Sequence, residues 1–378
     1  MRPIFTLLVL VMSCAGRYSE IVALPAVLDG GVIGPGDEVM LAVVGSTEPD
    51  TGPADGLARD IAAHAPDLLL LPGGIVRRGG PRAWLAAVER WHGVAPAVSA
   101  LAGGSERRCD RRLLGFHQVF EAQGVPDLGG PVTFSHLDIV SAGVRWRLVM
   151  LDSDRRAMGD RWHDQLFWLP KVITPGDYDH LLVVLDAPLV SLADARHADP
   201  AAAVSALLDV IVEYAGPTAL MGVFMGGGSA NEIHLPGGSF GEAHVVAGNG
   251  AVHAEDLWHR GQSDLPGRPV VQLVDGFDAA LRAEMTRRVA QGRIGPLSVD
   301  RMNREAFPSD VLPIRGWWEV VLDGRELALG FHLEDGDAYD AVYRIRYTRS
   351  AGWVADRDSA QADLAEPDLV EPDAAKPD

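Results

Sequence analysis

Lysine and cysteine are almost absent from this chain of 378 residues. Lys171 and Lys376 are its only lysines, and Cys14 and Cys109 are its two cysteines. Two cysteines cannot form a disulfide framework, and no Cys-x-x-Cys or His-x-x-x-His spacing points to a structural zinc. Acids outnumber bases 52 to 33, giving a net charge of −19. That balance excludes a protein that coats nucleic acid, which needs a basic face to displace counterions.

Apolar residues are plentiful by contrast, at 47% of the chain, together with 42 glycines and 25 prolines. This much apolar side chain must be buried, so the composition excludes a fully disordered or collagen-like chain. The length allows one large α/β domain with a smaller addition.

The N-terminal segment has the features of a secretory signal. Arg2 precedes an apolar stretch over residues 4–12, which is shorter than the ~20 residues that a membrane-spanning helix needs. The stretch Val11-Met12-Ser13-Cys14 resembles a bacterial lipobox, in which the cysteine is diacylated and becomes the mature N-terminus. The resemblance implies a signal peptide over residues 1–13 and a lipoprotein anchored in the bacterial cell envelope, on the periplasmic or outer face. The alternatives are an ordinary signal cleaved elsewhere and a buried N-terminal strand.

Short apolar runs alternate with amphipathic helical stretches from Glu38 onward. Continuous apolar strands separated by helices predict a mostly parallel sheet that is covered on both faces. In such sheets ligands bind at the carboxyl ends of the strands, which here are loops of small residues. The predicted strands are 39–44, 67–71, 97–101, 181–185 and 219–225, and the predicted helices are 54–63, 81–91, 160–169 and 200–214.

Alternating patterns predict further strands. Residues 132–140 and 144–151 form one predicted hairpin, and 233–235 and 244–246 form another. A helix is predicted over 275–291, and residues 316–347 read as two or three antiparallel strands. The predicted organisation is a linker over 14–37, a main domain over 38–261, a C-terminal α+β extension over 262–355, and a disordered acidic tail over 356–378.

Five predicted strand ends carry a series of motifs. They read Gly45-Ser46-Thr47-Glu48, Leu71-Pro72-Gly73-Gly74, Ala102-Gly103-Gly104-Ser105-Glu106, Leu185-Asp186-Ala187-Pro188 and Met225-Gly226-Gly227-Gly228-Ser229. Their order and spacing resemble the calcineurin-like metallophosphoesterases, whose blocks are G-D-x-H, G-D-x-x, G-N-H-[DE], a strand-end His and G-H-x-H. Leu151-Asp152-Ser153 and the segment 165–169 resemble the family's stretch between its third and fourth blocks. The resemblance covers about residues 38–250 and implies a four-layer αββα sandwich of two mixed sheets, here with a C-terminal antiparallel β extension.

In that family two divalent metals such as Fe, Mn or Zn, ~3.5–4 Å apart, activate a water for in-line phosphoryl displacement. The resemblance places Gly74 at the bridging acid and Ser105 at the catalytic His. Only Glu48 and Asp186 carry side chains that commonly ligate a metal. The resemblance therefore implies the fold without retained catalytic residues and without a metal cofactor. The degenerate pocket positions are Ser46, Glu48, Gly74, Gly104, Ser105, Asp186, Gly227 and Ser229.

Several side chains near the motifs remain candidates for ligand contact: Glu48, Glu106, Asp186, Asn231 and Arg78. One alternative is that Glu48, Glu106 and Asp186 converge on a single hard cation. A second is that the glycine loops bind an anion through backbone N–H groups, with Arg78 beside them. A third is that the glycines only form turns.

The leading hypothesis is a membrane-anchored lipoprotein that has lost catalysis and binds a small anionic ligand or a protein partner through the old pocket or the C-terminal β segment. The alternative is a divergent phosphohydrolase with a reduced, carboxylate-only metal site around Glu48 and Asp186. The third hypothesis is a structural scaffold of the envelope. An enzyme needs convergent acids and a bound ion, a binder needs a formed pocket or apolar patch, and a scaffold needs neither.

Overall fold

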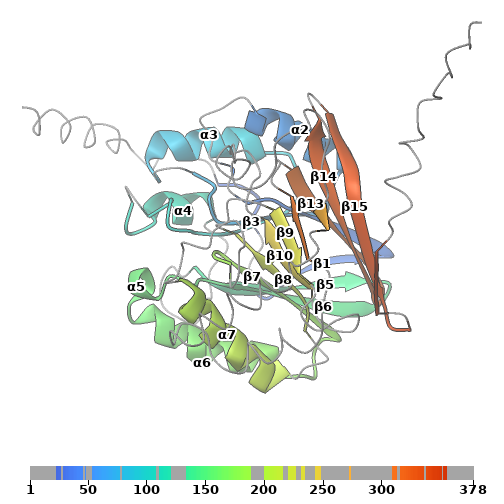
Figure 1. The fold of residues 1–378 in the computed structure, drawn as a ribbon. Coiled ribbons are helices and arrows are strands. Elements are labelled where there is room, and N and C mark those ends of the chain that lie inside the picture. The colour runs from blue at the N-terminus through green and yellow to red at the C-terminus, as the bar shows by residue number, and fades with distance from the viewer. Residues whose placement is uncertain are drawn as a thin grey trace, which may run out of the picture.

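Two mixed β-sheets lie face to face between two layers of helices (Figure 1). The computed structural model describes residues 23–26, 29–45, 47, 53–76, 79–107, 110–120, 133–188, 200–215, 220–226, 231–234, 243–247, 272–273, 309–312, 316–335, 338–350 and 352–355. The N-terminal signal, the helix predicted over 275–291 and the acidic tail lie outside these residues.

The first sheet has seven strands in the order β16-β15-β14-β13-β2-β3-β4. Its strands are β2 (Glu38–Val43), β3 (Leu68–Pro72), β4 (Val98–Leu101), β13 (Gly316–Asp323), β14 (Glu326–Asp335), β15 (Ala338–Thr348) and β16 (Gly352–Ala355). β2, β3 and β4 are parallel, whereas β13 runs antiparallel to β2 with Trp318 opposite Val43 and Asp323 opposite Glu38. The C-terminal antiparallel strands therefore continue this sheet and pack on the core.

The second sheet has nine strands in the order β1-β5-β6-β7-β8-β10-β9-β12-β11. Its strands are β1 (Gly31–Gly36), β5 (Ser135–Ser141), β6 (Val144–Leu151), β7 (His180–Leu185), β8 (Leu220–Met225), β9 (Asn231–His234), β10 (Ala243–Ala247), β11 (Gln272–Leu273) and β12 (Ser309–Leu312). Both predicted hairpins are antiparallel pairs, β5 with β6 and β9 with β10. β1 falls within residues 14–37, where a linker was expected, and pairs parallel to β5.

Helices cover the outer face of each sheet (Figure 1). On the seven-stranded sheet lie α2 (Pro53–His64), α3 (Pro81–Trp91) and α4 (Leu114–Val119). On the nine-stranded sheet lie α6 (Arg161–Ile173) and α7 (Pro200–Ala215), with the short α5 (Arg155–Met158) before α6. None of the helices in the described ranges combines the length and apolar character that crossing a membrane requires.

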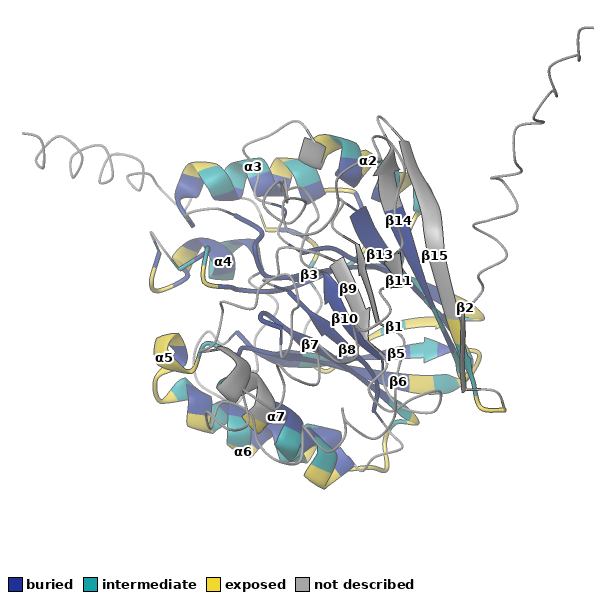
Figure 2. Cartoon of the chain, in the orientation of Figure 1, coloured by how far each residue is buried: buried dark blue, intermediate teal, exposed yellow. Residues whose placement is uncertain are grey.

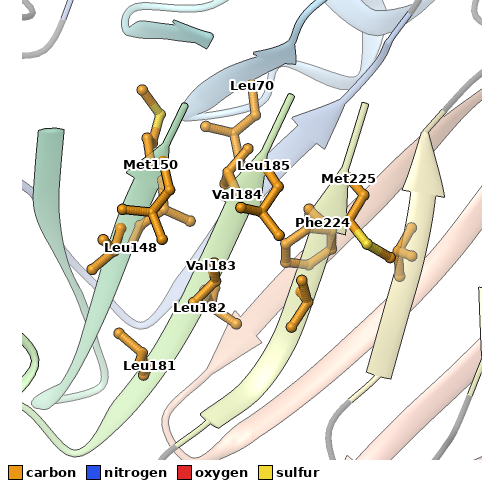
Figure 3. Close-up of a cluster of buried hydrophobic side chains, with 14 of the residues drawn as sticks. Leu70, Leu148, Met150, Leu181, Leu182, Val183, Val184, Leu185, Phe224 and Met225 are labelled. Carbon is orange, nitrogen blue, oxygen red and sulfur yellow. The ribbon is translucent and has the colours of Figure 1, made fainter. Parts of the chain in front are cut away.

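Strand β3 shows why the central strands read as continuous apolar runs. Leu68, Leu69, Leu70 and Leu71 are all buried. Leu68 and Leu70 belong to the core between the two sheets, and Leu69 and Leu71 belong to the core beneath α2 and α3. Figure 3 shows Leu70 beside leucine and valine side chains of β7 in the first of these cores. Figure 2 shows the same pattern as buried central strands and helices with one buried side.

The prediction of one mostly parallel sheet is wrong, because the chain forms two mixed sheets. A continuous apolar run shows only that both faces of a strand are covered, and a second sheet covers a face as well as a helix does. The four-layer αββα sandwich with a C-terminal antiparallel extension, which the family resemblance implied, is confirmed.

A glycine sets the distance between α3 and α4. A Cβ atom on Gly115 of α4 would lie 2.1 Å from Cδ1 of Trp84 on α3. The indole of Trp84 is fully buried and contacts the rings of Phe116 and Phe120, with centroids 6.1 and 6.3 Å away. By contrast, a Cβ atom on Gly56 of α2 would have no other atom within 4 Å.

We predict opposite effects for alanine at these two helical glycines. Gly115→Ala forces α4 away from Trp84 and should lower the free energy of unfolding by ~1–3 kcal/mol, the usual cost of overpacking. Gly56→Ala should raise it by ~0.5–1 kcal/mol, because alanine restricts the unfolded chain and favours the helix. Urea denaturation of both variants measures the difference. A neutral Gly115→Ala would contradict this packing of α4 on α3.

Candidate functional site

Carboxyl ends of strands from both sheets meet backbone to backbone. A Cβ atom on Gly226, directly after β8, would lie 1.5 Å from the carbonyl oxygen of Pro72 at the end of β3. A Cβ atom on Gly45, two residues after β2, would lie 1.8 Å from the carbonyl oxygen of Ala247 at the end of β10. No side chain fits at either glycine, so these two motif glycines bring the loops of the two sheets into direct contact.

A third close approach lies next to them. A Cβ atom on Gly73, after β3, would lie 3.4 Å from Cα of Gly103, after β4, and 3.5 Å from the carbonyl oxygen of Asp186, after β7. Gly73 also has φ +91°, a conformation that favours glycine. We call this meeting of loops the strand-end site, formed by Gly45, Gly73, Gly74, Gly103, Glu106, Arg107, Asp152, Asp186 and Gly226.

Glu106 is a buried carboxyl group held by backbone N–H groups. Its Oε1 accepts hydrogen bonds from the N–H groups of Ile75 (2.6 Å) and Val76 (2.9 Å), and its Oε2 accepts from the N–H of Gly103 (2.8 Å) and from the Ser105 hydroxyl (3.1 Å). Complete burial raises the pKa of Glu106, and these hydrogen bonds lower it only in part. These backbone donors therefore bind a carboxyl group of the chain itself, which leaves them unavailable to an external anion.

The neighbouring residue, Arg107, reaches to the other sheet. Its Nη2 donates to Oδ2 of Asp152, which follows β6, and its Nε lies 3.5 Å from Oδ2 of Asp154. Asp152 is fully buried, and its Oδ2 also accepts from the hydroxyl of Thr133. Burial lowers the pKa of the Arg107 guanidinium, but the carboxylates of Asp152, Asp186 and Asp154 raise it more, so Arg107 stays charged.

Asp186 stands where the resembling family has its strand-end His, and with Glu48 it is one of the two family positions that carry an acid here. Its Oδ1 accepts from the N–H of Ser153 at 2.6 Å, and its side chain is buried. Burial and the nearby charge of Asp152 raise the pKa of Asp186 to about 7, while the hydrogen bonds of Ser153 and the charge of Arg107 lower it only in part. Asp186 therefore gains or loses a proton near neutral pH.

The other predicted site positions divide into two groups. Gly74 is buried with φ +67°, Gly104 is exposed, and the Ser105 hydroxyl donates to Glu106. Of Asn231 the backbone alone is described, at the start of β9. Ser46, Glu48, Arg78, Gly227, Ser229 and Cys14 lie outside the described residues.

The described residues of the site do not fit the two metals of the resembling family. Gly74 and Gly104 have no ligating atoms on a side chain, and the carboxylate of Glu106 already accepts four hydrogen bonds. Asp186 is bonded to Ser153 and lies in the field of the Arg107 cation, which repels a metal ion. Across the described ranges, no three His, Cys, Asp or Glu side chains gather in a way that could hold a metal. We therefore derive no reaction step through a metal.

Two members of the site were not predicted as functional. Arg107 directly follows the third motif and is not among the predicted candidates, and Asp152 is included only in the family-like stretch Leu151-Asp152-Ser153. Besides that stretch, the sequence signal for Asp152 is its place directly after an apolar strand. Gln165 of α6 fixes the backbone there, since its amide exchanges two hydrogen bonds of 3.0 Å with the N–H and carbonyl of Asp152.

Comparison with known proteins reveals similarity in structure alone. Neither a protein-family model nor a curated protein sequence matches this chain. The fold is similar to that of GAP50, the anchor in the inner membrane complex of Plasmodium, with a TM-score of 0.53 and 13% identity over 81% of this chain and 87% of that one. It is also similar to PhoD, with a TM-score of 0.51 and 12% identity over 89% of this chain and 73% of PhoD. Purple acid phosphatase PPD1 from yellow lupin seeds matches with a TM-score of 0.49 and 10% identity over 80% of this chain and 53% of PPD1.

At these identities the similarity concerns the fold and not the activity. Two packed mixed sheets, flanked by helices and with loops converging at the strand ends, define a calcineurin-like phosphoesterase sandwich. This is the fold class of the chain.

The raised pKa of Asp186 predicts that stability falls as the pH rises. The folded state keeps a proton on Asp186 up to about pH 7, whereas the unfolded chain releases it near 3.8, so the free energy of unfolding decreases between these values. Asp186→Asn stays neutral and keeps the acceptor for Ser153. We expect the variant to gain ~2–3 kcal/mol over the wild type between pH 5 and pH 8, at ~1.4 kcal/mol per pH unit up to the folded pKa.

Urea denaturation of both proteins at the two pH values measures this gain. Asp160→Asn, at an exposed position before α6, is the control and should follow the wild type. An Asp186→Asn effect of the same size at pH 5 and pH 8 would show that Asp186 does not titrate in this range and would contradict the prediction.

Proposed function

We propose that this chain is a catalytically inactive protein of the phosphoesterase fold that acts by binding. The observation that carries the proposal is the chemistry at the family's ligand positions. Glycine or serine stands at Ser46, Gly74, Gly104, Ser105 and other positions of the series, and these residues supply neither a bridging acid nor a proton donor.

The hydrogen bonds of the described site support the same proposal. In a metal-dependent phosphoesterase, divalent ions attach to side chains from several strand ends and hold them in place. Here Glu106 attaches the loop after β4 to the loop after β3, and Arg107 attaches it to the loop after β6. Side chains of this chain thus hold the loops together, and the site has little need of a metal to keep its shape.

The likeness to GAP50 supports a role other than hydrolysis. GAP50 is described as the anchor in the inner membrane complex of Plasmodium. Because a protein of this fold serves as an anchor, the architecture is compatible with binding or scaffolding in place of hydrolysis. For this chain we propose a small anionic ligand or a protein partner, and no nucleic acid, since the net charge is −19.

We further propose that Cys14 carries lipid and attaches the protein to a bacterial envelope membrane. The support is the charge of Arg2, the apolar stretch over 4–12 and the lipobox-like Val11-Met12-Ser13-Cys14 in that order. Two or three acyl chains at ~0.8 kcal/mol per buried methylene hold a domain firmly on a bilayer.

Metal analysis tests the loss of catalysis. We expect protein purified from cells supplied with Mn, Fe and Zn, then desalted, to contain only traces of each metal. We also expect no hydrolysis of p-nitrophenyl phosphate or bis-p-nitrophenyl phosphate above the buffer rate. Elemental analysis and the release of p-nitrophenol measure the two quantities.

Stoichiometric metal would overturn the proposal and favour the divergent phosphohydrolase. Glu48→Ala and Asp186→Ala would then show whether these two acids hold the ion, since each ligand lost should reduce the bound metal. Asp177→Ala, at an exposed position before β7 and so at the opposite end of that strand from Asp186, is the matched control.

Metabolic labelling tests the lipid. Cells that express the chain and grow with radioactive palmitate should incorporate label into the wild-type protein and into Cys109→Ser, because Cys109 is not the modified residue. Cys14→Ser should carry no label and should leave the membrane fraction. Label that persists in Cys14→Ser would place the acyl group elsewhere.

A further inference from the structure

Exposed arginines gather beside the strand-end site. Arg111 and Arg112 are exposed in the turn before α4, and Arg155 and Arg156 are exposed in α5. Leu114, the first residue of α4, is 52% exposed and is one of the few large apolar side chains open to solvent in the described ranges. We call this surface the arginine edge, formed by Arg111, Arg112, Leu114, Arg155 and Arg156.

These arginines are not neutralised by neighbouring carboxylates of the described part of the chain. None of the four guanidinium groups has an ion-pair partner there. Asp110, which directly precedes Arg111, is buried and accepts a hydrogen bond from the N–H of Gly115 at 2.8 Å. In a chain with net charge −19, this edge is a local concentration of positive charge.

The two arginine pairs belong to one edge of the molecule. Arg107, which precedes the turn, lies 3.5 Å from Asp154, which precedes α5, and also pairs with Asp152. These ion pairs join the segment that leads into α4 to the segment that leads into α5. Figure 1 shows α4 and α5 along the same side of the molecule, with β15 on the opposite side.

The N-terminal segment enters the fold at this edge. The N–H of Leu24 donates to the carbonyl oxygen of Val119 at the end of α4 (2.9 Å), and the N–H of Val98 on β4 donates to that of Pro25 (3.0 Å). About ten residues separate Cys14 from Leu24, and they span at most ~35 Å when fully extended. A lipid on Cys14 therefore keeps Leu24, and the end of α4 to which it bonds, within about that distance of the bilayer.

We infer that the arginine edge docks on the anionic headgroups of the membrane to which Cys14 attaches the chain. The inference rests on the lipidation proposed above. Each arginine near an anionic surface contributes about fivefold in affinity, and the short tether supplies the high local concentration that such weak contacts need. Leu114 places its apolar atoms at the interface between headgroups and acyl chains.

In sequence, an acidic segment follows the strand at the opposite edge of the seven-stranded sheet, and its charge favours the same orientation. The seven-stranded sheet has β4 at one edge, where residues 23–26 attach, and β16 at the other. The acidic residues 356–378 follow β16, with eight acids against two bases. An anionic surface repels this segment and attracts the arginine edge, so both forces turn the molecule the same way. The loops of the strand-end site lead into α4 and α5, and docking places them next to the headgroups.

Site-specific fluorescence on the full-length lipidated protein tests this orientation. In a Cys109→Ser background, Leu114→Cys carries the environment-sensitive dye NBD, and the protein is reconstituted into vesicles. One set of vesicles is phosphatidylcholine alone, and the other contains three parts phosphatidylglycerol to seven parts phosphatidylcholine. We expect a blue shift of NBD emission and quenching by a shallow spin-labelled lipid in the anionic vesicles only.

Matched variants separate docking from effects of the dye or of net charge. Ser350→Cys, exposed in the turn between β15 and β16, carries the same dye on the opposite edge and should remain in water in both vesicles. Adding Arg111→Glu and Arg112→Glu to the Leu114→Cys protein should abolish the blue shift and reduce the quenching at least tenfold. Arg325→Glu with Arg349→Glu makes the same change in net charge on exposed residues elsewhere and should leave both signals intact.

The outcomes separate this inference from the proposals on which it rests. If the protein floats with neutral vesicles but NBD at position 114 stays in water in anionic ones, the lipid anchor stands and docking is overturned. Failure to float with either vesicle would overturn the lipidation and the docking together. If both charge-reversal pairs reduce the blue shift and the quenching equally, net charge, and not this edge, sets the orientation. The metal analysis described above tests the proposed loss of catalysis separately from docking and lipidation.

Discussion

Two adjacent side chains, Glu106 and Arg107, hold the converging loops of this fold together. The Glu106 carboxyl group is buried among backbone donors of the loops after β3 and β4, and the Arg107 guanidinium reaches Asp152 after β6. A buried polar or charged group is costly unless it is paired or fully hydrogen-bonded, and each of these two meets that requirement with partners from another loop. The strand-end site keeps its shape because neither group can leave its partners without a large cost in free energy.

Close backbone contacts between the two sheets add to this attachment of the loops. Glycines at the strand ends bring backbones of the two sheets into contact, where a Cβ on Gly226 or Gly45 would lie within 2 Å of a carbonyl oxygen. No side chain fits at these two positions. The strand-end site also holds a buried acid, Asp186, whose pKa burial and Asp152 raise to about 7.

Much of the fold follows from local pattern. The helix predicted over residues 81–91 coincides with α3, and the predicted run 181–185 matches β7 within one residue. The division into two sheets was not accessible to periodicity, because Leu68 to Leu71 read alike whether a helix or a second sheet covers them. Only the order of the motifs, through their family resemblance, pointed to the sandwich.

The sequence by itself determined most of the described strands and helices, the acidic balance and the residue types at the motif positions, since each depends on residue type and short spacing. Tertiary structure alone decided what fills the site. Ile75 and Glu106 are 31 residues apart, and Arg107 and Asp152 are 45 apart, so no local pattern links them. Whether Glu106 ligates an external cation or binds the chain's own N–H groups is set by which loops converge. That convergence results from burying both sheets in one core.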